Sequence, residues 1–103
     1  MEHIYRHGDI PFYPLKGKVE GEIVRHNGSF VLAEGETTGH KHLLTCPRME
    51  IRKVAGGYIL ALVEEAQISH EDHKTIKLPA GNYFVGKERE VDHFVGAVRK
   101  VLD

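Results

Sequence analysis

The sequence lacks several features that would assign it to a functional class. It has a single cysteine, Cys46, so it contains no internal disulfide, and a free thiol is compatible with a reducing cytoplasm. No motif that activates a thiol surrounds Cys46, which we therefore do not expect to act as a nucleophile. The longest apolar run, residues 58–63, is far shorter than the roughly 20 residues that span a bilayer. No secretion or lipidation signal is visible, so we expect a cytoplasmic protein with no membrane partner.

An excess of charge of one sign is also lacking. The 103 residues include 14 basic and 15 acidic side chains, which leave a formal net charge of −1. This balance does not produce the broad positive field of a general nucleic-acid binder, so we do not expect nucleic acid as a partner. Amide side chains are scarce while Lys, Arg and Glu are plentiful, a bias that is associated with heat-adapted proteins and predicts a thermophilic source.

Short apolar segments separated by turn residues indicate an all-β protein. Residues 19–25 alternate between polar and apolar side chains, as a half-buried strand does. Asn27-Gly28 favours a tight hairpin turn after this strand, because both residues accept a positive φ, and His26 should then be exposed. Further strands are predicted at residues 30–34, 40–45, 49–54, 57–64, 75–78 and 83–89, with 58–63, apolar on both faces, as the central strand.

These segments predict one all-β domain over residues 1–103. A small β-barrel or two-sheet roll would accommodate many short strands, because closing a sheet removes its edges. Pro11 and Pro14 predict that residues 10–15 form an edge strand or an extended arm. The C-terminal stretch fits either a short helix with Asp92 as its N-cap or, given its valines and Gly96, a final strand.

Two short histidine clusters are the strongest functional signal. His40 and His42 are two residues apart, so in a strand both imidazoles point to the same face. His70 and His73 are three apart, a spacing that suits a turn or one helical turn. His3 and His7, by contrast, lie near a terminus, where we expect them to be solvated.

The two clusters together could hold a divalent metal ion. Zinc, iron and nickel bind neutral imidazole nitrogen when several ligands converge from a rigid frame. The predicted metal ligands are His40, His42, His70 and His73. Glu71 and Glu36 are the candidate catalytic carboxylates. Each could act as a general base or accept a hydrogen bond that orients an imidazole, and Asp72 is a third acid that could take one of these roles. The alternative is a pair of polar loops whose histidines only make hydrogen bonds in a solvated groove.

Part of the chain resembles the cupin superfamily. The resemblance rests on a His-x-His pair at the start of a strand and on the turn Leu78-Pro79-Ala80-Gly81 that leads into an aromatic strand. It implies a small barrel that holds a divalent metal. The chain departs from the cupin pattern because residues 82–85 contain no histidine and residues 43–49 contain no acid.

A second resemblance covers most of the chain. The boxes around Gly35 to His42, His70 to Tyr83 and Arg89-Glu90 resemble those of small bacterial, archaeal and phage proteins of unassigned function. Where those proteins have an aromatic residue after Arg-Glu, this chain has Val91. The resemblance implies that the two histidine boxes form one unit and adds Arg89 and Glu90 to the candidate site residues.

The sequence thus supports three hypotheses. The first is a cupin-like barrel with a metal site that performs hydrolase or lyase chemistry or binds a small acidic ligand. The second is a metal-free interaction module that contacts a protein or nucleic-acid partner. The third is a homodimer formed through the strand edge at residues 10–15.

Overall fold

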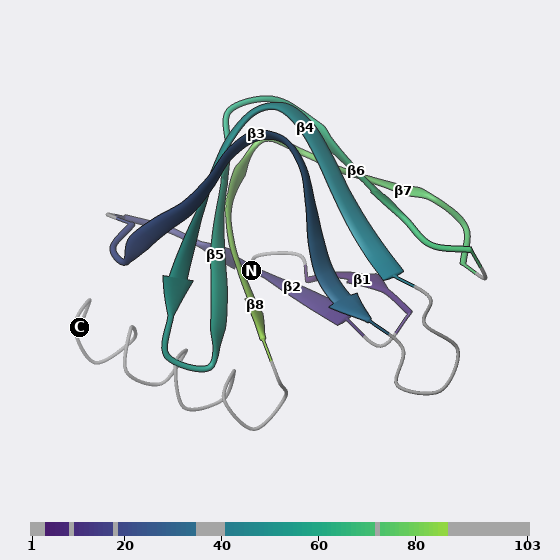
Figure 1. Ribbon diagram of the computed structural model, residues 1–103, viewed down its shortest axis with the longest axis horizontal. Coiled ribbons are helices and arrows are strands. Elements are labelled where there is room, and N and C mark those ends of the chain that lie inside the picture. The colour runs from purple at the N-terminus through teal and green to yellow at the C-terminus, as the bar shows by residue number, and fades with distance from the viewer. Residues whose placement is uncertain (1–3, 9, 18, 35–40, 72, 87–103) are drawn as a thin grey trace.

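The computed structural model describes residues 4–8, 10–17, 19–34, 41–71 and 73–86 (Figure 1). Within these ranges all regular secondary structure is β, as predicted. The strands are β1 (Tyr5–His7), β2 (Ile10–Leu15), β3 (Glu22–Glu34), β4 (Lys41–Val54), β5 (Gly57–Leu62), β6 (Ala66–Ser69), β7 (Ile76–Leu78) and β8 (Gly81–Gly86). The described residues include no helix long and apolar enough to cross a membrane.

The strands form one strongly bent antiparallel sheet that curls into a barrel-like shape (Figure 1). Their order is β1-β2-β8-β5-β4-β6-β7, and β3 lies along the other side of β4. The two long strands, β3 and β4, arch over the molecule and contribute to both halves of the curled sheet. One edge of β4 pairs with β6 through Leu43 to Thr45 and then with β5 through Met49 to Val54.

The predicted hairpin turn at Asn27-Gly28 is wrong, although both residues do adopt the positive φ on which the prediction rested. Asn27 and Gly28 have φ values of 45° and 88°, yet they lie inside β3 at a shift of register against β4. The Asn27 side chain accepts a hydrogen bond of 3.0 Å from the Met49 backbone N–H. The two positive φ values therefore bend β3 at a place where Asn27 alone lies opposite residues 47–49, which form a bulge in β4. His26 beside them is exposed as predicted.

The break between the predicted strands at 40–45 and 49–54 is also absent, because β4 continues through Pro47. Pro47 has no N–H to donate, but it belongs to the β4 bulge opposite Asn27, where the regular ladder is already interrupted. The Arg48 carbonyl there accepts a hydrogen bond of 3.1 Å from the Val63 N–H. Both long strands thus bend at the same place, which turns the first half of β4 away from β5 and toward β6.

The core fills the inside of the curled sheet. It consists of apolar side chains from six of the strands: Ile10, Phe12, Leu44, Cys46, Met49, Ile51, Leu60, Leu62, Ala66, Ile68, Leu78, Tyr83 and Val85. Ile59 and Phe84 are buried on the opposite face of the sheet in a smaller cluster. The strand β5 therefore buries side chains on both faces and lies between β4 and β8, which confirms its prediction as the central strand.

The segment at residues 10–15 is not the edge of the sheet. This strand, β2, lies between β1 and β8, and Ile10 and Phe12 are buried. Its first half, which contains Pro11, pairs with β1, and its second half, which contains Pro14, pairs with β8. Each proline therefore pairs with one neighbouring strand only. Pairing with β1 covers an edge that the proposed homodimer would use. The homodimer itself stays a prediction.

Some predictions concern parts of the chain outside the described residues. These are the helix or strand at the C-terminus, the part of the first histidine box that contains Glu36 and His40, and the pair Arg89 and Glu90.

Candidate functional site

Two rows of inward-facing side chains change from apolar residues to histidine at the same end of the molecule. In β4 the buried residues alternate as Cys46, Leu44 and His42, because every second side chain of a strand points to the same face. In β6 the same alternation gives Ala66 and Ile68, both buried. Leu44 lies opposite Ile68 in the register, and two residues further along these rows come His42 and His70. Their ring centroids are 4.3 Å apart.

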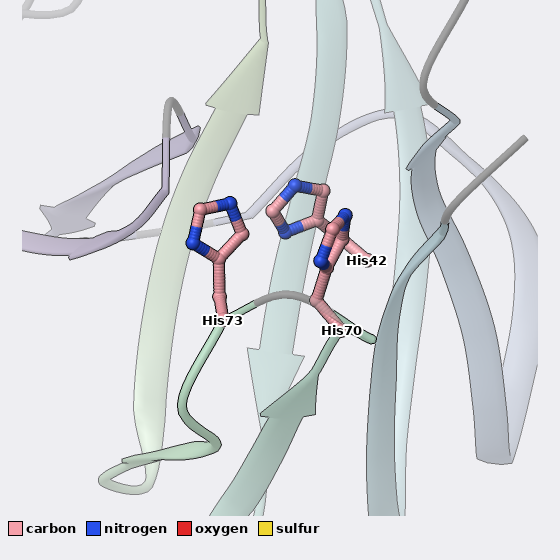
Figure 2. A group of neighbouring side chains, drawn as sticks. All are labelled: His42, His70 and His73. Carbon is pink, nitrogen blue, oxygen red and sulfur yellow. The ribbon is translucent and has the colours of Figure 1, made fainter. Parts of the chain in front are cut away.

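The loop between β6 and β7 adds a third imidazole, that of His73. Its ring centroid lies 4.6 Å from that of His70 and 5.7 Å from that of His42. One nitrogen from each of the three rings lies within 4.8 Å of the others. Figure 2 shows the three rings facing a common space, with His42 on its strand and the other two on the loop. His42 is buried, His70 is half-buried and His73 is exposed, so the group runs from the core to solvent.

The loop is held against β4 by Glu71. One oxygen of its carboxylate accepts a hydrogen bond of 3.3 Å from the backbone N–H of Lys41. Lys41 precedes His42 and Glu71 follows His70, so this bond ties together the two segments that supply the imidazoles. The exposed Glu71 carboxylate therefore follows His70 in sequence and lies close in space to the segment that carries His42, where its hydrogen bond has a structural role.

A fourth imidazole, that of His7, packs beneath the group, and the prediction that His7 is solvated is wrong. Only 2% of its surface is exposed. Its Nδ1 lies 2.9 Å from Nδ1 of His42, and its Nε2 lies 2.9 Å from the carbonyl oxygen of Lys74. The turn at Gly8 returns the chain so that β1 pairs with β2, and this pairing places His7 on the inner face. The position of His7 near the N-terminus therefore did not predict its burial, which depends on the pairing of β1 with β2.

Burial is the main reason why the pKa of His7 is lower than its ordinary value of 6.5. The hydrogen bond to the Lys74 carbonyl acts in the opposite direction, and the neighbouring rings of His73 and His70 lower the pKa further. His7 is therefore neutral at pH 7, with one ring nitrogen protonated and the other able to accept.

Gly8 leaves the space that the His73 ring occupies. A Cβ atom at this position would lie 2.8 Å from Nε2 of His73 and 3.2 Å from Cε1 of His42. The φ of Gly8 is +61°, a conformation that glycine adopts without strain. This part of the site was not predicted from the sequence, because no local pattern distinguishes His7 and Gly8 from a solvated turn near the terminus.

Three of the four predicted metal ligands are thus described, and they converge. His42, His70 and His73 come together, whereas His40 lies outside the described residues. Of the predicted carboxylates, Glu71 lies beside the group, and Glu36 and Asp72 are outside the described residues. Three imidazole nitrogens at this separation are a donor set that suits zinc and related divalent ions.

Comparison with known proteins identifies the family of the chain but no activity. A family profile named as a domain of unknown function, DUF8820, matches residues 6–88, a range that includes all four clustered histidines. No significant match was found among curated proteins or among solved structures. These comparisons do not support the cupin resemblance or the group defined by the histidine boxes. Because the profile covers most of the chain, the protein belongs to the family of the domain of unknown function DUF8820.

Proposed function

We propose that the protein binds one divalent transition-metal ion through His42, His70 and His73. The observation that carries the proposal is the convergence of three imidazole nitrogens within 4.8 Å from two segments distant in sequence. His42 also lies at the end of a buried row of β4 side chains, so its position is fixed by the core and not by a loop alone. Zinc, iron and nickel all accept such ligands, and metal content must decide among them.

Three protein ligands leave at least one coordination position for another molecule. Structural zinc sites are closed by four protein ligands, whereas catalytic sites keep a position for water or substrate. His73 is exposed, so that position would be reached from solvent. A divalent ion held by neutral imidazoles keeps its full positive charge, which favours a small acidic ligand. When bound, it would also supply the polarisation that hydrolase or lyase chemistry requires.

Glu71 is the candidate general base among the described carboxylates. It is exposed and adjacent to His70, and one of its oxygens accepts the Lys41 N–H. Glu36 keeps the same proposed role, and His40 is the proposed fourth imidazole; neither belongs to the described part of the chain. If His40 also coordinates, the ion would have four protein ligands and a structural role would be favoured.

The first test is the metal content of the untagged, purified protein by elemental mass spectrometry. We expect close to one zinc, iron or nickel ion per chain in the wild type and none in a variant with His42, His70 and His73 changed to alanine. The matched control is His26→Ala, since His26 is exposed at the distant bend of β3. Adding His40→Ala to single variants would show whether a fourth imidazole contributes.

The proposal fails if the wild type holds no metal and takes up none at neutral pH. The second candidate function, a metal-free interaction module, would then remain. Its support is the exposure of the large aliphatic side chains Ile23, Val24 and Val31 on β3, each at least 36% exposed.

A further inference from the structure

His7 and His42 meet through the same ring nitrogen, Nδ1, at 2.9 Å. Two neutral imidazoles can approach this closely only if one nitrogen carries a proton and the other presents its lone pair. The pair is buried: His7 is 2% and His42 9% exposed. Water therefore does not replace the bond readily, and the direction in which it runs matters for both rings.

The contact on the other side of His7 determines that direction. Nε2 of His7 lies 2.9 Å from the carbonyl oxygen of Lys74. A carbonyl oxygen can only accept, so Nε2 of His7 must donate and carries the proton of the neutral ring. Nδ1 of His7 then has a lone pair and accepts, and Nδ1 of His42 is the donor.

We propose that His7 is a positioning residue that holds the proton of the neutral His42 ring on Nδ1, so that the lone pair of this ring is on Nε2, the nitrogen that would bind the metal ion. In this order, His7 donates its Nε2–H to the Lys74 carbonyl, and His42 donates its Nδ1–H to Nδ1 of His7. In known metal sites, ligating histidines donate their second ring N–H to a carboxylate, a carbonyl or water. Here a neutral histidine takes the place of that acceptor. The affinity part of this inference rests on the proposed function.

The same contacts distinguish His7 from a fourth ligand. Both of its nitrogens are engaged, one with Lys74 and one with His42. Its ring centroid lies 6.4 Å from that of His70, compared with 4.3 Å between His42 and His70. Among the described residues, the group of nitrogens that lie mutually within 4.8 Å includes the other three histidines and not His7.

The proton positions can be measured without metal. Long-range proton–nitrogen correlation spectra of the ¹⁵N-labelled, metal-free wild type near pH 7.5 report which nitrogen of each ring is protonated. We expect His42 to be protonated at Nδ1 and His7 at Nε2. Protonation of His42 at Nε2 would overturn the proposal, whatever the protein does with metal ions.

The second arm measures binding of Co²⁺, whose absorption spectrum reports its ligands. His7→Phe keeps a ring of similar size but removes both hydrogen bonds, and we expect the affinity to fall about 10- to 100-fold with unchanged band positions. His7→Gln has an amide that both donates and accepts, and should recover most of the loss. His26→Ala is the control and should bind like the wild type. Altered Co²⁺ bands in His7→Phe would show that His7 coordinates and would overturn the positioning role.

The two failures are distinguishable. If the wild type binds no Co²⁺ but His42 is protonated at Nδ1, the metal-binding function fails and the hydrogen-bond order stands. If the wild type binds Co²⁺ and His7→Phe binds equally well, the metal site stands and the positioning role fails. If His7→Phe does not fold, the wild-type spectra and the His7→Gln affinity still decide the question.

Discussion

At the scale of single residues, Gly8 controls the space beside the histidine group. A methyl group there would lie 2.8 Å from Nε2 of His73, a separation that non-bonded atoms do not tolerate. His73 is exposed and can swing away, so the clash should displace a ligand without unfolding the protein. Gly8→Ala should therefore weaken binding of zinc, measured by competition with a chromophoric chelator, by about 10-fold or more.

The matched control for this change is Gly17→Ala. Gly17 also has a positive φ, of 92°, but a Cβ atom there has no neighbour within 4 Å. Both substitutions carry the backbone cost of about 1–2 kcal/mol that a left-handed conformation imposes on alanine. Only Gly8→Ala should affect zinc affinity, and equal affinities in the two variants would contradict the assignment of this space to the site.

His7 makes the stability of the metal-free protein depend on pH. Its pKa is lowered in the folded state from the ordinary 6.5, mainly by burial, with His73 and His70 adding to the effect and the Lys74 carbonyl opposing it. Above about pH 6.5 His7 is neutral in both states and adds no pH dependence. As the pH falls through 6.5 the unfolded chain binds a proton first, so the free energy of unfolding decreases.

Urea unfolding in the presence of a chelator at pH 7.5 and pH 5.5 measures this effect. We expect the wild type to lose more stability over that interval than His7→Phe, which has no imidazole at this position. The other rings that face His7, those of His42, His70 and His73, are present in both proteins and so do not account for the difference. An equal loss in both proteins would refute the contribution of His7.

At the scale of secondary-structure elements, the bend of β3 and β4 brings the site together. Without it, the first half of β4, which carries His42, would continue along β5 instead of pairing with β6. Asn27 stabilises the bend in two ways, since it adopts a φ of 45° and its side chain accepts the Met49 N–H. The Met49 side chain is buried, so an unpaired N–H at this position is costly.

Asn27→Ala should lower the free energy of unfolding by about 2 kcal/mol, as measured by urea denaturation, because it loses the acceptor and strains the backbone. Asn27→Asp keeps an acceptor and tolerates the left-handed conformation, so it should be close to the wild type. Asn27→Gly relieves only the strain and should fall between the two. A loss of less than about 0.5 kcal/mol in Asn27→Ala, typical of an ordinary surface position, would show that the bend does not depend on this side chain.

At the scale of the whole molecule, a metal ion would link β4 to the loop between β6 and β7. A ligand that binds only the folded state stabilises it by about 2.7 kcal/mol at a concentration 100 times the dissociation constant. For a chain of this size each kcal/mol raises the melting temperature by about 4–8 °C. We therefore expect zinc at that excess to raise the melting temperature by about 10–20 °C at pH 7.5, measured by circular dichroism.

The increase should disappear near pH 5, where the imidazoles are protonated and cannot bind metal. It should also be absent from the variant that lacks His42, His70 and His73, while His26→Ala should behave like the wild type. An increase of the same size in the triple variant would mean that zinc binds elsewhere on the chain.

The sequence alone was sufficient for features that depend on local periodicity. The alternation of side chains predicts most of the strands, and the apolar run at residues 58–63 predicts the central one, because a strand has a period of two residues. The same period indicates that His42 continues the row of Leu44 and Cys46. The histidine pairs are short-range patterns, and for this reason three of the predicted ligands could be chosen before their positions were known.

Only the tertiary structure could decide the features that depend on which segments pair. Asn27-Gly28 satisfies its positive φ values equally well in a hairpin turn and in a bend inside a strand, and the long pairing of β3 with β4 selects the bend. His7 has no sequence pattern that separates it from a solvated residue near a terminus. It is buried because β1 folds back on β2, next to a strand and a loop that are distant in sequence. Contacts between distant segments depend on the free energy of the whole packed sheet, which no local stretch of residues encodes.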